Sequence, residues 1–145
     1  MKAIEEIIEF ANQNPAAWLA TAQDNQPHVR AMAMWFADKT GFYFHTGTHK
    51  RLSTQLNGNP RVEIGFFNPG EGMDTMQMVR VTGSIEMVHD AALEKKLFEE
   101  RSWLNAIKAA WPNERIFIFR IAHGEAQYWN MSLNCMEKDT PPIVF

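Results

Sequence analysis

Three potential cations follow one another where a strand-like segment gives way to a helix-like one. In the stretch FHTGTHKRL, residues 44–52, two threonines and a glycine lead into His49, Lys50 and Arg51. Thr48 has the side chain of a helix N-cap, so the three cations would fill the first helical turn. Each cation there is unfavourable by roughly 0.3–1 kcal/mol, because the N-terminus of a helix carries partial positive charge.

A bound anion would resolve this conflict. A phosphate at the junction would receive hydrogen bonds from backbone N–H groups, threonine hydroxyls and cationic side chains together. Arg30 adds a further cation, on a half-buried predicted strand that we expect beside strand 42–46. Two alternatives remain open: Lys50 and Arg51 point into solvent, and Arg30 pairs with an acid such as Glu63.

The histidines do not predict a metal site. His45 and His49 are four residues apart, but they lie on either side of the predicted junction, and the sequence supplies no third ligand nearby. Cys135 is the only cysteine, and no acid or oxyanion-binding motif accompanies it. We therefore expect neither a metal centre nor a cysteine nucleophile.

Length and composition predict one compact domain over residues 1–145. The chain has 46% hydrophobic residues and a net charge of −3, which provides no basic field for nucleic acid or anionic membrane. The N-terminus MKAIEEIIEF does not have the pattern of a signal peptide, and no apolar run approaches the roughly 20 residues that span a bilayer. We therefore expect a cytoplasmic protein.

Hydrophobic periodicity predicts a mainly β protein of the α+β class. Residues 17–22, 28–37 and 42–46 alternate as three strands of an antiparallel meander. Further strands are predicted over 61–67, 76–88, 116–121 and 125–129, and helices over 3–13, about 49–57, and two segments after Asp90. We count roughly six strands in a small antiparallel barrel, with Gly83 at a corner and a C-terminal tail that is either loose or laid on a partner. The ten Phe and five Trp suit either an aromatic-rich core or a dimer interface.

The order of four motifs resembles a known family. PHVRAMAMWF, FYFHTGTHKRL, NPRVEIGFF and QMVRVTGSIE, over roughly residues 10–125, resemble the pyridoxamine 5′-phosphate oxidase-like, FMN-binding split-barrel family. The THK step is similar to the GHK of the nitroimidazole-resistance branch. The resemblance implies a six-stranded split barrel with a few flanking helices, and a homodimer with FMN at the subunit interface.

The resemblance also assigns cofactor-binding roles. Arg30 would reach the phosphate, while the segment that follows it would flank the isoalloxazine ring. The junction would grip the phosphate, with Lys50 and Arg51 able to exchange roles, and an aromatic would come from the second subunit. The implied cofactor-binding residues are Arg30, Ala31, Met32, Ala33, Met34, His45, Thr46, Thr48, His49, Lys50, Arg51, Gln77, Met78 and Trp129.

The function implied is that of a flavoprotein oxidoreductase of the general-stress or reductase type, with the chemistry at the flavin. We expect no vitamin B6 oxidation, because the tail lacks the arginine and histidine with which the true oxidase holds its substrate. Two alternatives stay open on the same barrel: a non-catalytic flavin or haem binding module, and a deazaflavin (F420)-dependent reductase.

Overall fold

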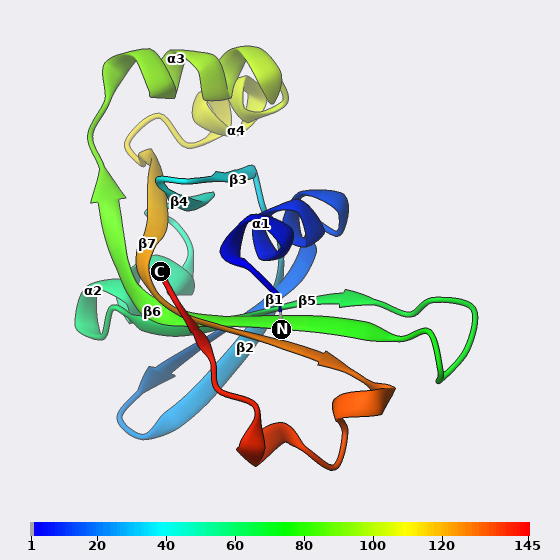
Figure 1. The fold of residues 1–145 in the computed structure, drawn as a ribbon. Helices are drawn as coiled ribbons and strands as arrows, with labels where there is room; N and C mark the ends of the chain where they lie inside the picture. The colour runs from blue at the N-terminus through cyan, green and yellow to red at the C-terminus, as the bar shows by residue number, and fades with distance from the viewer. Residues whose placement is uncertain (1) are drawn as a thin grey trace.

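The computed structural model describes residues 2–145 and contains an eight-stranded antiparallel sheet with flanking helices (Figure 1). The predicted class is confirmed, but the strands number eight instead of six. In chain order the elements are α1 (Ile4–Gln13), β1 (Ala16–Gln23), β2 (Gln26–Ala33), β3 (Phe36–Asp38), β4 (Gly41–Gly47), α2 (Arg51–Gly58), β5 (Arg61–Asn68), β6 (Gln77–Val88), α3 (Ala91–Glu100), α4 (Leu104–Ala110), β7 (Ile116–Asn130), η1 (Met131–Leu133), η2 (Glu137–Asp139) and β8 (Ile143–Val144).

The sheet is an open barrel whose two edges are adjacent in sequence. Its strands run in the order β2-β1-β5-β6-β7-β4-β3, so the chain passes from one edge to the other at Met34 and Trp35. The backbone N–H of Met34 donates to Pro15 on one side, and that of Trp35 donates to Tyr43 on the other. The predicted meander is therefore wrong: β2 pairs with β1 and β3 pairs with β4, but β2 and β4 do not pair.

Inward-facing side chains fill the barrel. β1 alternates between exposed and buried positions, as an antiparallel strand with one covered face should. The core brings together aromatic and aliphatic side chains from almost every strand, with α1 and α2 adding leucine, isoleucine and alanine. The largest fully buried side chains include Phe42, Phe44, Phe66, Phe119, Leu19 and Ile64.

Helix α1 is fixed to the sheet by a reciprocal pair of hydrogen bonds. The side-chain amide of Asn12 donates to the carbonyl of Ala37 at 2.9 Å, and its oxygen accepts from the N–H of Ala37 at 2.9 Å. Because these bonds satisfy the backbone of β3 on its unpaired side, they also terminate the sheet there.

Helices α3 and α4 form a cap at one end of the molecule, beyond the ends of β6 and β7 (Figure 1). Asp90 caps α3 as predicted, accepting from the N–H of Leu93 at 3.0 Å. A second small core joins the cap to the sheet through Leu97, Leu104, Tyr43 and Ile118.

The long strands β6 and β7 bend at a pair of glycines. Gly83 lies opposite Gly124, and the register shifts immediately after Gly83, which confirms the predicted corner. A Cβ on Gly124 would lie 1.9 Å from the carbonyl oxygen of Thr82, so the close approach needs glycine. β7 runs through this corner as one strand, where the sequence predicted two.

Residues 131–145, here called the C-terminal arm, fold back on their own barrel. The backbones of Phe145 and Gly124 exchange two hydrogen bonds of 3.1 Å, and the Phe145 ring lies 5.5 Å from that of Phe42. The sequence predicted a tail that is either loose or laid on a partner. The loose tail is wrong, because these residues are bonded to the chain's own barrel. None of the helices within residues 2–145 is long and apolar enough to cross a bilayer.

We predict that Phe145→Ala lowers the free energy of unfolding by about 2 kcal/mol, because a partly buried ring against the core is lost. Urea denaturation at neutral pH measures this change. Val144→Ala is the matched control: its side chain is 76% exposed, so its effect should stay within about 0.5 kcal/mol. Equal losses in the two variants would contradict the anchoring role of Phe145.

Candidate functional site

Arg30 points into the end of the barrel that α2 closes. Its Nη1 donates to the hydroxyl of Thr21 at 2.8 Å, and its Nη2 donates to the side-chain oxygen of Gln55 on α2. Thr21 also donates to Gln55, at 2.7 Å. The guanidinium therefore lies against the second turn of the helix that follows the three cations.

No carboxylate within residues 2–145 pairs with Arg30. Glu63, the acid suggested from sequence, pairs instead with Arg80 at 3.7 Å, and this alternative is wrong because Glu63 and Arg30 point to opposite faces of the sheet. Burial lowers the pKa of Arg30, which means that its charged form lacks full compensation. A half-buried cation with only neutral partners is suited to an anionic ligand.

The junction between β4 and α2 differs from the predicted helix start. Lys50 is the N-cap of α2 and makes no side-chain capping bond, so of the three cations only Arg51 lies within the helix. Thr48 is not the cap, because its hydroxyl donates to Glu114 and accepts from the N–H of Arg115 at 2.9 Å. These bonds hold Thr48 to the start of β7. We call residues 45–51 the basic corner.

Gly47 lets His49 fold back over the end of β4. A Cβ at Gly47 would lie 2.4 Å from the His49 ring, so any larger residue would displace that ring. The His49 ring stacks on the ring of Trp111 at the end of α4, with centroids 5.6 Å apart and planes 4° from parallel. The cap thus contributes one wall beside the basic corner.

A small hollow of about 60 Å³ lies between the basic corner and α4. His45, Thr46, Gly47 and Lys50 line it on one side, and Trp103 on the other. The hydroxyl of Thr46 is buried and has no hydrogen-bond partner within the described residues. A buried polar atom without a partner is costly, and a ligand oxygen would satisfy it.

His45 is largely buried beneath the cap. Its ring lies 5.9 Å from that of Trp103, and Nη1 of Arg101 lies 2.7 Å from its Nε2. Burial, followed by the positive charges of Arg101 and Lys50, lowers the pKa of His45 to about 4. The imidazole is therefore neutral at physiological pH.

The segment after Arg30 divides between the two faces of the sheet. Met32 and Met34 face inward, and Met34 is fully buried. Ala31 and Ala33 face outward and are exposed, beside Trp18 on β1, whose side chain is 58% exposed. Ala31 and Ala33 themselves leave the backbone of β2 uncovered on this face, so a flat ring could approach it beside Trp18.

Gln77, Met78 and Trp129 lie away from the basic corner, at the far end of β6 and β7. Met78 and Trp129 are directly opposite each other and share the outer face with Phe67. Gln77 points to the other face, where it lines a hollow with Lys2, Glu6 and Tyr128. Within one chain, therefore, these three residues are not brought together with Arg30.

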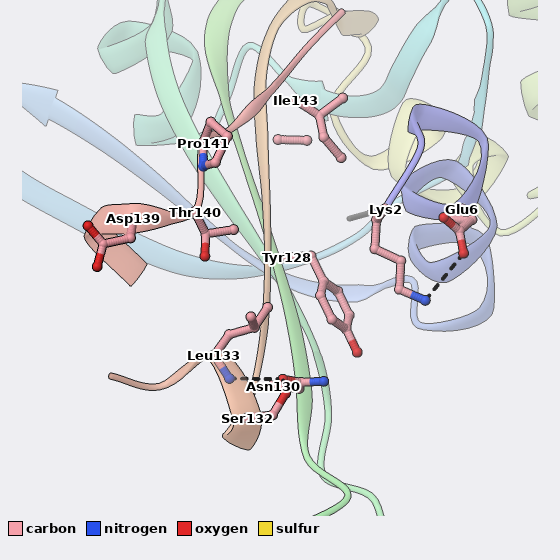
Figure 2. Close-up of a pocket in the computed structure, with 11 residues that line it drawn as sticks. Lys2, Glu6, Tyr128, Asn130, Ser132, Leu133, Asp139, Thr140, Pro141 and Ile143 are labelled. Carbon is pink, nitrogen blue, oxygen red and sulfur yellow. Dashed lines mark hydrogen bonds and ion pairs between the residues drawn. The ribbon is translucent and has the colours of Figure 1, made fainter. Parts of the chain in front are cut away.

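A larger hollow of about 470 Å³ adjoins that end of β7. Figure 2 shows Lys2 and Glu6 on one side and Thr140 of the C-terminal arm on the other, with the Tyr128 ring between them. Lys2 pairs with Glu6 at 3.3 Å and lies over the Tyr128 ring. None of the residues predicted to bind a cofactor lines this hollow.

Sequence reasoning missed Gln55, Thr21, Arg101 and the two tryptophans that flank α4. The sequence could have indicated Gln55, because it falls on the apolar stripe of α2 beside Leu52 and Leu56, where a polar side chain requires a buried partner. The sequence gives no indication of Arg101, because a basic residue at the end of a helix is ordinary.

Comparison with known proteins decides the family. The family model described as pyridoxamine 5′-phosphate oxidase matches residues 3–129. The chain belongs to the pyridoxamine 5′-phosphate oxidase family. A pyridoxine/pyridoxamine 5′-phosphate oxidase of Pseudomonas paraeruginosa is 30% identical to this family member over 131 residues, covering 84% of this chain and 58% of that protein. The chain spans about half the length of the curated relatives that it matches.

Similarity to solved structures confirms the split-barrel fold of the chain. A NimC/NimA family protein from Clostridium acetobutylicum superposes with a TM-score of 0.75 at 19% identity, covering 100% of this chain and 95% of that one. An FAD-binding protein from Mesorhizobium loti gives a TM-score of 0.64 at 22% identity, covering 88% of this chain and 93% of that one.

We predict that His45 makes stability depend on pH. Its pKa rises from about 4 in the folded state to about 6.5 on unfolding, so the unfolded chain binds the extra proton as the pH falls through this range. Lowering the pH from 7 to 5 should therefore remove about 2 kcal/mol of stability through this group. Urea denaturation at the two pH values, with His45→Gln as control, isolates the effect. The prediction fails if the variant loses as much stability as the parent chain.

Proposed function

We propose that the protein binds FMN and is a flavin-dependent oxidoreductase acting on a small molecule. Membership of the pyridoxamine 5′-phosphate oxidase family supports the flavin, as does the likeness to the FAD-binding protein from Mesorhizobium loti. The observation that carries the proposal is the half-buried Arg30, which has neutral partners and no carboxylate within residues 2–145.

Arg30 and the residues of the basic corner fit a phosphate. Arg30 supplies a rigid fork of donors, Lys50 a flexible ammonium group, and Thr46 a buried hydroxyl that has no partner within the described residues. Among residues 2–145, no carboxylate lines the adjoining hollow to repel an anion. We expect Arg30, Lys50 and Thr46 to bind the phosphate, with His49 or Arg51 adding a further contact.

The flavin, when bound, supplies the transfer of electrons. The chain's own part is to orient the ring and to exclude water from one side of it. Ala31 and Ala33 leave the backbone of β2 accessible on the outer face, where a planar ring can lie close. We assign no general acid or base among the described residues of this region.

We further propose that two copies of the chain enclose the cofactor. Trp18, Val29 and Phe67 are 58%, 63% and 45% exposed on the outer face, and an apolar patch of this kind is typical of an interface. A second copy on this face would bring its Trp129 and Met78 toward the Arg30 end of the first. This arrangement would unite the two groups of residues that a single chain keeps apart.

We expect Arg30→Ala with Lys50→Ala to weaken FMN binding by about 100-fold or more. Each lost hydrogen bond to a charged group costs about 1.5–3 kcal/mol, which is at least about tenfold in affinity. Quenching of FMN fluorescence on titration with protein measures the dissociation constant. Lys39→Ala with Lys95→Ala is the control, since it removes the same charge from exposed positions away from the basic corner.

The absorbance spectrum of the purified protein tests the choice of cofactor. Flavin bands, or their appearance on adding FMN, support the proposal, and a spectrum of deazaflavin or a Soret band of haem overturns it. A colourless protein that ignores added FMN overturns it as well. Unchanged affinity in the double variant would show that the phosphate lies elsewhere.

We predict that Trp18→Glu converts a dimer into monomers, because a carboxylate would be buried at the interface without a partner. Light scattering of the eluted protein should give the mass of two 16.7-kDa chains for the parent and of one for the variant. Trp18→Phe keeps an apolar ring and should remain dimeric. A parent protein that elutes as a monomer would contradict the interface.

A further inference from the structure

One arginine joins the helical cap to both the end of β2 and the basic corner. Arg101, which follows α3, donates through Nη1 to the carbonyl of Ala33 at 3.1 Å and through Nη2 to that of Met34 at 2.9 Å. The same Nη1 lies 2.7 Å from Nε2 of His45. Its guanidinium thus contacts three acceptors: one at the end of β2, one in the passage that follows β2, and one on β4.

The contact with His45 fixes the position of a proton. A guanidinium has donors and no acceptor, and it stays charged at any ordinary pH. Nε2 of His45 must therefore accept, and the single proton of the neutral ring must be on Nδ1. Protonation of Nε2 would break this bond and place two cations in contact.

Lys50 also opposes the protonation of His45, and no carboxylate among the described residues lines the hollow beside the ring. Lys50 before α2 adds a positive charge, and His49 lies on the same side of the hollow, stacked on Trp111. The start of α4 contributes the indole of Trp103, and the end of β2 and the residue after it contribute two carbonyls that Arg101 already occupies. Glu100, the acid next to Arg101 in the sequence, accepts from the indole N–H of Trp35 and pairs with Lys96.

We propose that Arg101 is a positioning residue that holds His45 as the Nδ1–H tautomer, so that His45 donates a hydrogen bond to an oxyanion in the basic corner. The proposal rests on the proposed function, because that oxyanion is the cofactor's phosphate. His45 lines the hollow that Lys50 also lines, and its Nδ1 has no acceptor within residues 2–145. Both side chains are donors, which suits an oxygen-rich anion.

A neutral donor has a functional advantage here. A histidine with an ordinary pKa near 6.5 would gain and lose a charge across the physiological range, and the affinity for an anion would vary with it. The contact with Arg101 instead keeps the hydrogen bond present and the charge of His45 constant. The carbonyl contacts at Ala33 and Met34 couple this arrangement to the strand that we expect to face the flavin.

Nitrogen-15 NMR of the histidine rings tests the proposal without any cofactor. Between pH 5 and 8 the purified protein should show His45 protonated at Nδ1 and unprotonated at Nε2. In Arg101→Gln, loss of the adjacent cation should raise the midpoint of His45 titration by about one to three pH units. Arg115→Gln, which removes an exposed arginine outside the hollow, should leave the midpoint unchanged.

FMN binding gives a second readout. At each pH, the FMN dissociation constant of Arg101→Gln is divided by that of the parent protein. The ratio removes the effect of the phosphate's own titration near pH 6, because that titration affects both proteins alike. The ratio should be largest at pH 8 and fall toward pH 5, where His45 of the variant gains a charge that attracts the phosphate. A ratio that does not change with pH overturns the role of Arg101.

The outcomes separate this proposal from the proposed function. If the protein shows the expected NMR result but does not bind FMN, the flavin site is overturned, and so is the role of His45 as a donor to the phosphate. The hydrogen bond between Arg101 and His45 is supported even then. FMN binding by a protein in which His45 carries its proton on Nε2, or titrates near pH 6.5, overturns the further inference alone. The tautomer is measured in the unmodified chain, so this arm does not depend on the folding of a variant.

Discussion

The hydrogen bonds of Gln55 with Arg30 and Thr21 determine how α2 sits in the end of the barrel. A buried amide, hydroxyl and guanidinium are each costly unless they are satisfied, and here they satisfy one another. The rotation of α2 about its axis is therefore specified, since its apolar residues Leu52 and Leu56 must face the core at the same time. The position of Lys50 at the start of the helix follows from this constraint, as does the shape of the basic corner.

Local patterns predicted most of the fold. Alternation of apolar residues gave the strands, Asp90 marked the start of α3, and Gly83 marked the corner of the long strands. The passage from β2 to β3 escaped prediction, because the alternation continues through Met34 and Trp35 and only the partners of their backbones reveal the break. For a related reason, the sequence did not predict that β7 is one continuous strand. Gly124 has the character of a turn residue, but it lies opposite Gly83 within the sheet.

The candidate site was predictable in its residue types and less so in its connections. Arg30, Lys50 and Thr46 were identified from the motifs, whereas the bonds of Thr48 to Glu114 and Arg115 join positions far apart in sequence. Gln77 and Met78 illustrate a different limit. Adjacent residues of a strand face opposite ways, so a motif that names both as ligands of one group conflicts with the geometry of any single sheet surface.

The passage of the chain between the sheet edges at Met34 and Trp35 also bears on how the protein folds. β2 and β3 are neighbours in sequence but lie at opposite ends of the strand order, so the sheet cannot grow strand by strand along the chain. The β5 and β6 hairpin can form early, because a short loop joins its strands. β7 must then pair with β6 across the two helices of the cap, and β4 must pair with β7 across about half the sequence. Long-range pairing of this kind slows folding, and the edge of β7 that awaits β4 is exposed to other chains until that step is complete.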